Sequence, residues 1–324
     1  MKKRVVAVRR LHAEHLAQLA RASHVDYFPE LDDSNMDAFL ASVEQAHGLI
    51  GGKLSIDEAL LERAPHLEVV ATISVGYDNF PVEAMTQKGI ALCNTPDVLT
   101  ETTADTGFAL IMAASRRVAE LDRWVREGHW RAHIGEQQFG CDVHGKTLGV
   151  IGLGRIGAAV ARRGALGFGM PILYSNSSPK PHFESELGAK RCSLDSLLKQ
   201  SDVVCVTVPL TSDTYHLIGQ EAFKAMKPSG IFVNISRGAV VDEEALVAAL
   251  QTNEIAAAGL DVFEQEPLAS VSPLMAMSQV VILPHIGSAT HETRAAMAQL
   301  AVDNLLATLR GERPANLANP QVWE

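Results

Sequence analysis

The chain of 324 residues is 47% hydrophobic and 20% charged, a composition typical of globular proteins with substantial cores. Its 38 acidic and 28 basic side chains give a formal net charge of −10 without the basic patch typical of nucleic-acid binders. No apolar run reaches the ~18 residues of a membrane span, and residues 5–8 are too few for a secretory signal. We therefore expect a cytoplasmic protein of about two domains that binds neither nucleic acid nor membrane.

Metal and disulfide sites are not expected either. The cysteines lie far apart without a CxxC pair, and Cys205 stands in the apolar run VVCVTV, which is typical of a small core residue. Two histidine pairs have helical spacing, His12 with His15 and His129 with His133, but no third ligand is evident for either. The sequence thus predicts no metal.

The first hundred residues alternate short apolar runs with helical patterns. Strands are predicted at 5–8, 47–52, 68–73 and 90–95, with helices such as 12–22 and 35–46 between them. This alternation predicts a parallel sheet with helices on its faces. A single long helical pattern then runs from Glu101 to about Arg131, and Gly128 with the following loop ends it.

A second strand–helix series begins at residue 146. Apolar strands are predicted within 146–151, 171–178, 202–210, 230–236, 256–263 and 280–285, and helices within 158–169, 193–200, 219–226 and 242–253. A last amphipathic helix follows and stops at Gly311. The expected fold class is α/β with doubly wound parallel sheets.

A G-x-G-x-x-G pattern opens this second series. It consists of Gly152, Gly154 and Gly157, with Arg155 and Ile156 filling the last gap. The pattern directly follows an apolar strand and precedes a helix, which is the context that dinucleotide binding requires. The glycines permit a tight turn, close approach of a pyrophosphate and close packing of helix on strand. Three turn glycines in this order by chance are the alternative interpretation.

The residues at the end of the next strand indicate which cofactor is bound, because they lie where the adenosine ribose of the cofactor would bind. An NAD site usually carries an acidic residue there, about 20 residues after the glycines. This chain has Ser175, Asn176, Ser177 and Ser178 instead. Lys180 follows, Arg155 is near, and no carboxylate occurs before Glu184. Because a carboxylate would repel a 2′-phosphate, we predict NADP(H) in preference to NAD(H). A polar loop that accepts either cofactor is the alternative.

Three further polar side chains each follow an apolar strand: Arg237, Glu266 and His285. In open α/β sheets the crevice beyond the strand ends holds the ligand, so the three can converge there. Taken singly, each would be an ordinary surface or loop residue. Together they suit reduction of a 2-oxo acid, whose carbonyl oxygen needs a proton and a positive neighbour. Histidine can supply the proton, and arginine offers a planar fork to a carboxylate.

The segments VIGLGRIG, NISRGAVVDEEAL, AAGLDVFEQEP and LPHIGSATHETR, with ISVGYDNFP nearer the N-terminus, resemble the D-isomer-specific 2-hydroxyacid dehydrogenase family. The likeness covers the whole chain and is closest to the glyoxylate/hydroxypyruvate reductase B group, also described as 2-ketogluconate reductases. It implies a Rossmann cofactor domain at 99–287. It also implies a discontinuous, flavodoxin-like substrate domain, made of 1–98 and a returning C-terminal helix within 288–324.

By position, the resemblance implies that Arg237 binds substrate, that Glu266 pairs with His285, and that His285 donates the proton. Backbone groups of Val75 and Gly76 would hold the substrate carboxylate. The resemblance places Pro209, Ile235 and Asp261 around the nicotinamide. It places Gly287 and Ser288 in the turn beside the cofactor, with Ser288 also contacting the substrate. Residues 101–128 resemble a dimerisation arm, so a homodimer is expected. Close relatives often carry arginines at 175–178, where this chain has none.

The expected activity is NADPH-dependent reduction of glyoxylate, hydroxypyruvate or 2-ketogluconate to D-2-hydroxy acids. Another family member, of the D-lactate or D-3-phosphoglycerate type, is the alternative within enzymes. An enzyme that binds phosphoglycerate would need extra basic residues at the cleft, and no arginine occurs near SVGYDN. A dinucleotide-sensing, corepressor-like protein is the alternative from a different class.

Overall fold

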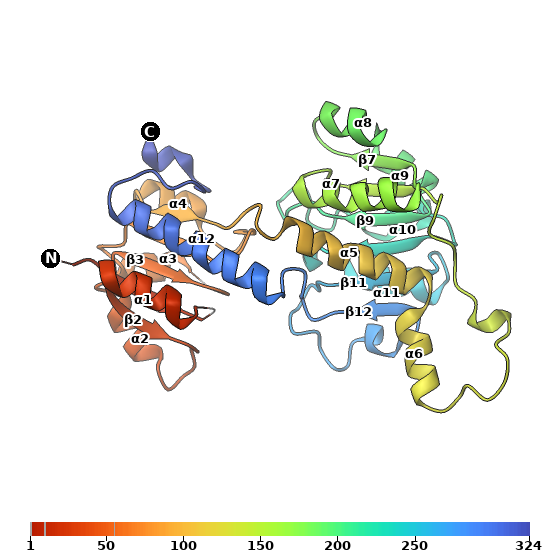
Figure 1. Cartoon of the computed structure of the whole chain (residues 1–324), viewed down its shortest axis with the longest axis horizontal. Helices are drawn as coiled ribbons and strands as arrows, with labels where there is room; N and C mark the ends of the chain where they lie inside the picture. The colour runs from red at the N-terminus through yellow and green to blue at the C-terminus, as the bar shows by residue number, and fades with distance from the viewer. Residues whose placement is uncertain (1, 10, 55) are drawn as a thin grey trace. The chain divides into compact units, whose positions relative to one another are not determined.

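The computed structural model describes residues 2–9, 11–54 and 56–324 and divides the chain at Leu99 and Ser288 into two units. The first unit comprises the chain up to Leu99 together with Ala289–Glu324, and the second unit is Thr100–Ser288. Figure 1 labels their helices and strands. Within the described ranges, no helix combines the length and hydropathy that a bilayer span requires.

The first unit contains a five-stranded, all-parallel sheet in the order β2-β1-β3-β4-β5. Its strands are β1 (Arg4–Val8), β2 (His24–Phe28), β3 (Gly48–Gly51), β4 (Val69–Thr72) and β5 (Ala91–Cys93). This is the flavodoxin-like order, as predicted. Strand β2 was not predicted, because this edge strand, HVDYF, is partly exposed and is not an apolar run.

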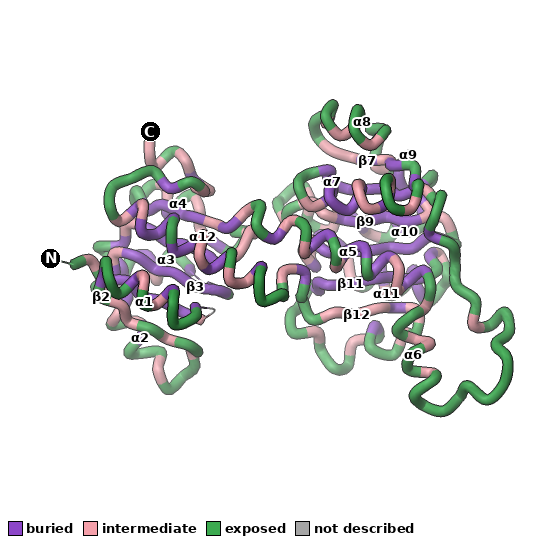
Figure 2. Tube along the Cα trace, viewed as in Figure 1, coloured by how far each residue is buried: buried purple, intermediate pink, exposed green. Residues whose placement is uncertain are grey.

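Helices cover both faces of this sheet. They are α1 (Ala13–Ala22), α2 (Met36–Val43), α3 (Glu58–Arg63), α4 (Val82–Gln87) and α12 (His291–Leu309). The apolar sides of α2, α3 and α4 form one core with the strands. On the other face, α12 packs on β3 and β4, where a side chain at Gly48 would meet Leu305. Apart from the edge strand β2, the strands form a largely buried layer between these helices (Figure 2).

The C-terminal segment closes the β5 edge of this sheet. The Ala318 N–H donates to the Leu92 carbonyl at 2.7 Å. Asn319, which is 1% exposed, accepts the Leu92 N–H at 2.8 Å and donates to the Ile90 carbonyl at 2.9 Å. A short 3₁₀ turn, Pro320–Trp323, follows. One buried amide therefore satisfies backbone groups that an open edge would leave to solvent.

The second unit contains a seven-stranded, all-parallel sheet in the order β12-β11-β10-β9-β6-β7-β8. Its strands are β6 (Leu148–Ile151), β7 (Ile172–Ser175), β8 (Lys190–Arg191), β9 (Val203–Val206), β10 (Ile231–Asn234), β11 (Ala257–Leu260) and β12 (Val280–Ile282). The strand order reverses between β6 and β9, which is the Rossmann arrangement. The predicted fold class is confirmed for both sheets.

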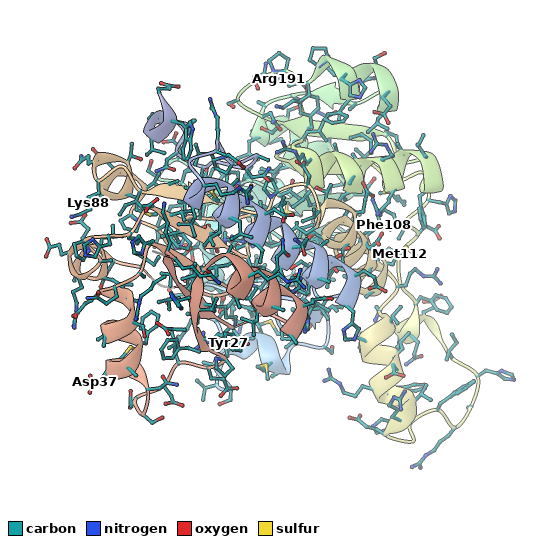
Figure 3. The ribbon with its side chains drawn as sticks, turned by 60° about the vertical axis from the view of Figure 1, so that its left-hand side comes forward. Tyr27, Asp37, Lys88, Phe108, Met112 and Arg191 are labelled. Carbon is teal, nitrogen blue, oxygen red and sulfur yellow. The ribbon has the colours of Figure 1, made fainter. Side chains whose placement is uncertain are left out.

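Two hydrophobic cores sandwich this second sheet. Its longer helices are α5 (Thr100–Ser115), α6 (Val118–Arg126), α7 (Arg155–Arg162), α8 (Pro181–Leu187), α9 (Leu194–Gln200), α10 (Gln220–Ala225) and α11 (Glu243–Gln251). One core contains α5 and α7, which run side by side in Figure 1, and the other contains α9, α10 and α11. Phe108 of α5, labelled in Figure 3, meets Phe168 with ring centroids 4.7 Å apart. Cys205 is a core residue, as predicted, and burial raises its pKa to about 12.

The single long helix predicted from Glu101 is wrong, because the chain breaks it into α5 and α6. Arg117 adopts a left-handed conformation with φ of 56°, which an α-helix cannot continue through. Its guanidinium pairs with Glu120 and donates to the carbonyls of Gln137 and Phe139. Neither glycine nor proline stands at this position, so no residue type signals the break in the sequence.

Removing the amide of Asn319 should destabilise the first unit. Asn319→Ala leaves the Leu92 N–H and the Ile90 carbonyl without their partner, so we expect the free energy of unfolding to fall by about 2–3 kcal/mol. Guanidinium unfolding followed by Trp323 fluorescence, with Trp124 and Trp130 replaced by phenylalanine, measures it. Gln321→Ala, at an exposed neighbour, is the matched control, and equal midpoints for the two variants would contradict the assignment.

Candidate active site

Arg237, Glu266 and His285 all lie at the carboxyl edge of the second sheet. Arg237 follows β10, Glu266 follows β11 and His285 follows β12. These three strands are parallel neighbours, so the loops that leave them meet at one edge. The structure thus brings together, from segments up to 48 positions apart (285 − 237), the three side chains that the sequence analysis selected.

A direct hydrogen bond joins two of them. His285 Nδ1 lies 2.7 Å from Glu266 Oε2, and the Phe263 N–H donates to Glu266 Oε1 at 3.2 Å. Burial alone would raise the pKa of Glu266. The hydrogen bond and charge of His285, the Phe263 N–H and the charge of Arg237 together hold that pKa below its ordinary value. Glu266 is therefore a carboxylate at neutral pH and fixes one nitrogen of the His285 ring.

A buried asparagine shapes the turn that carries Arg237. Asn234, 1% exposed at the end of β10, accepts the Ser236 N–H at 3.0 Å and hydroxyl at 2.8 Å. Its Nδ2 donates to the Arg237 carbonyl at 3.0 Å, and Arg237 Nη1 donates to the Ser236 carbonyl at 2.8 Å. Asn234 was not among the residues predicted from the sequence, although a polar residue at the end of an apolar strand is a recognisable signal.

Asp261 anchors the turn that carries His285. Its two carboxylate oxygens accept the backbone N–H groups of Ile286 at 2.7 Å and Gly287 at 2.8 Å. Burial raises the pKa of Asp261 and outweighs these two hydrogen bonds and the charge of His285, which lower it. His285 itself has a left-handed φ of 55°, a strained conformation that the two anchored residues after it help to hold. Contact of Asp261 with a nicotinamide carboxamide stays a prediction.

The glycine pattern forms the turn from β6 into α7. Gly152 has φ of +100°, and a side chain there would meet the backbone of Val208. A Cβ at Gly157 would lie 2.3 Å from the Gly152 carbonyl oxygen, so helix and strand pack closely. At Gly154, which precedes the first turn of α7 (Arg155, Ile156), a Cβ would meet nothing within 4 Å. The turn thus has the shape and the open approach that a pyrophosphate needs.

The polar loop after β7 is tied to this turn. Asn176 Oδ1 accepts the Leu153 N–H, and the Tyr174 hydroxyl accepts the Lys180 N–H at 2.8 Å. The same hydroxyl is hydrogen-bonded to Glu184, which is the first carboxylate after β7. The loop 175–178 therefore lies beside the glycine turn, as a ribose-binding loop must.

The remaining predicted residues lie in both units. Pro209 follows β9 and Ile235 follows β10, while Gly287 and Ser288 follow His285. Val75 and Gly76 belong to the first unit, in the loop after β4. Asn94 Nδ2 holds the Val75 carbonyl at 2.8 Å. Across the described ranges, the N–H groups of Val75 and Gly76 have no backbone acceptor.

Comparison with known proteins agrees with this geometry. The family model "D-isomer specific 2-hydroxyacid dehydrogenase, NAD binding domain" matches residues 108–287. A glyoxylate/hydroxypyruvate reductase B of Yersinia enterocolitica is 52% identical over 324 residues, covering 100% of this chain and 99% of the relative. This chain belongs to the D-isomer specific 2-hydroxyacid dehydrogenase family. It is an NAD(P)-dependent oxidoreductase, and its relatives place it in the reductase B group of that family.

Solved structures extend the similarity to the whole fold. The TT0316 protein of Thermus thermophilus superposes with a TM-score of 0.89 at 44% identity, covering 97% of this chain and 99% of that one. The NADPH-dependent glyoxylate/hydroxypyruvate reductase of Sinorhizobium meliloti, in complex with NADP and malonate, superposes with a TM-score of 0.88 at 33% identity. That match covers 99% of this chain and 98% of the other.

Asn234 should matter to this dehydrogenase although its side chain is buried. Asn234→Ala removes three hydrogen bonds around Ser236 and Arg237, so we expect the free energy of unfolding to fall by about 1–3 kcal/mol. Loosening of the Arg237 turn should also lower kcat/KM for a 2-oxo acid. Denaturant unfolding and steady-state kinetics measure the two effects. Gln251→Ala, on the exposed side of α11, serves as the control, and wild-type values for Asn234→Ala in both assays would refute the role.

Proposed function

We propose that this dehydrogenase reduces glyoxylate and hydroxypyruvate with NADPH, giving D-2-hydroxy acids, and that it also accepts 2-ketogluconate. One observation carries the proposal: the His285–Glu266 hydrogen bond lies at the sheet edge where the charge of Arg237 also acts on Glu266. The names of the Yersinia and Sinorhizobium relatives support the choice of substrates.

In this proposal the nicotinamide, when bound, supplies a hydride to C2 of the 2-oxo acid. Arg237 holds the substrate carboxylate and carbonyl through its planar fork and stabilises the negative charge that develops on the carbonyl oxygen. Glu266 accepts a hydrogen bond from the Nδ1–H of protonated His285, which keeps that proton on Nδ1 and leaves Nε2–H to face the substrate. His285 gives the Nε2 proton to that oxygen and ends as the neutral ring, still hydrogen-bonded to Glu266.

Backbone groups complete the proposed substrate and cofactor contacts. The N–H groups of Val75 and Gly76 bind the substrate carboxylate. The hydrogen bond from Asn94 Nδ2 to the Val75 carbonyl supports this role, because it holds the loop in place. Substrate is also contacted by Ser288, and the nicotinamide by Pro209, Ile235, Asp261 and Gly287. In this assignment the first unit is the substrate domain and the second is the cofactor domain.

The preference for NADPH is proposed from the loop after β7. Its residues 175–178 are small and uncharged, and the first carboxylate, Glu184, is engaged by Tyr174. An NAD site would present a free carboxylate to the ribose 2′-hydroxyl at this place. The Sinorhizobium relative, whose name specifies NADPH, supports the same cofactor.

The activity of two site variants and one control variant tests the proposed roles. His285→Gln should lower kcat for NADPH-dependent glyoxylate reduction by about 100- to 10,000-fold, because the proton donor is lost. Arg237→Lys should lower kcat/KM by about 100-fold or more, since an ammonium cannot replace the planar fork. NADPH binding should be unchanged in both variants. His24→Gln, at the amino end of β2, is the control, and full activity of His285→Gln would refute the assignment.

We propose a homodimer formed through the segment 118–142, which contains α6 and the chain after it (Figure 1). This segment exposes large apolar side chains: Val118, Val125, Trp130, Ile134 and Phe139. Trp130 is 63% exposed and Phe139 is 58% exposed. Such a concentration of apolar surface is typical of an interface between subunits.

The dimer should therefore depend on these side chains. The double variant Trp130→Asp, Phe139→Asp should sediment as a monomer under conditions in which the wild type is a dimer, because both charges would be buried at the interface. Val271→Asp, which changes an 88% exposed side chain outside the segment, is the control. A monomeric wild type, or a double variant that stays dimeric, would contradict the proposed interface.

A further inference from the structure

Residues 175–178, which would receive a 2′-phosphate, include no cation. Residues 175–178 are serines and one asparagine, and Asn176 uses its side-chain oxygen on the Leu153 N–H. Serine hydroxyls and an amide can donate hydrogen bonds, but they do not compensate a phosphate that carries about two negative charges. A cation that favours NADP(H) must therefore come from outside these four residues.

Arg191 on β8 reaches this loop from the neighbouring strand. In the β7–β8 pairing it lies opposite Tyr174, the residue just before the loop. Its Nε and Nη2 donate to the Asn176 carbonyl at 3.2 and 3.0 Å, and Nη2 also donates to the Ser177 carbonyl at 2.9 Å. The guanidinium is thus held against the backbone of the loop. Arg191 is exposed, and Figure 3 labels it at the surface.

The charge of Arg191 is not neutralised by these contacts, because carbonyl oxygens carry no net charge. Within the residues that the structure describes, no carboxylate forms an ion pair with Arg191, and Glu184 is hydrogen-bonded to Tyr174 instead. A guanidinium has five N–H donors, and the described acceptors engage only Nε and Nη2. The Nη1 edge therefore keeps two donors for a phosphate.

We propose that Arg191 binds the 2′-phosphate of NADP(H) and supplies the positive charge that residues 175–178 lack. The inference rests on the proposed NADPH preference and assigns that preference to a residue outside the ribose loop. The carbonyl contacts fix the guanidinium before the cofactor arrives, so little side-chain entropy is lost on binding. The cofactor preference then depends on β8, a two-residue strand at the edge of the sheet.

Lys190 provides a matched control on the same strand. It pairs with Leu173, and successive side chains of a strand point to opposite faces of the sheet. Lys190 lines a separate cavity with Thr147 and Lys227, at the opposite edge from the loop. Replacing it by alanine removes the same charge from β8 without touching the loop.

Calorimetric titration with adenosine 2′,5′-bisphosphate and with AMP tests the proposal without an activity assay. The wild type should bind the bisphosphate more tightly than AMP. Arg191→Ala should weaken bisphosphate binding by about 10- to 100-fold, the effect of losing charge-assisted hydrogen bonds, and should leave AMP binding unchanged. Arg191→Lys should keep part of the preference, because the charge remains. Lys190→Ala should match the wild type.

Equal weakening of both nucleotides in Arg191→Ala, at an unchanged thermal midpoint, would overturn the proposal, since Arg191 would then only hold the loop. Unchanged binding of both would overturn it too. A wild type that binds the two nucleotides equally would overturn the proposal together with the NADPH preference. The two proposals can also fail separately. If the wild type and variants bind the two nucleotides as predicted but the enzyme reduces neither glyoxylate nor hydroxypyruvate, the role of Arg191 is supported and the proposed substrates are wrong.

Discussion

Parallel pairing of β10, β11 and β12 is the constraint on which the candidate site depends. Parallel neighbours end at the same edge, so the loops that carry Arg237, Glu266 and His285 leave the sheet side by side. The same edge of β6 begins the glycine turn. A fold with antiparallel strands would have sent alternate loops to opposite edges. The arrangement of the proposed chemistry thus follows from strand direction before any side chain is considered.

Buried polar groups then set the finer geometry of each loop. Asn234 and Asp261 are each 1% exposed, and both use their side chains on backbone groups of the turns that carry Arg237 and His285. A buried polar group is costly unless it is hydrogen-bonded, and both are satisfied here. Each stabilises one backbone conformation of its turn. Of the side chains proposed to act on the substrate, Arg237 is partly exposed and His285 is exposed, while Asn234 and Asp261 lie in the core.

The sequence predicted those features that local pattern controls. Apolar runs predicted the central strands. The apolar run before Gly152, Gly154 and Gly157 and the helical pattern after them predicted the strand–turn–helix unit. The break at Arg117 was missed because it is fixed by carbonyls about 20 positions away, at Gln137 and Phe139. Arg191 was missed for a related reason. It stands well beyond the ribose loop in sequence, and only the pairing of β7 with β8 brings it back.

Transfer of a labelled hydride tests the proposed reaction most directly. The purified enzyme would be given hydroxypyruvate and NADPH deuterated at the transferred position of the nicotinamide, and the product would be analysed by mass and by chirality. We expect D-glycerate with one deuterium at C2. L-glycerate, a product without the label, or no product at all would contradict the proposed transfer of hydride to the 2-oxo carbon beside Arg237 and His285.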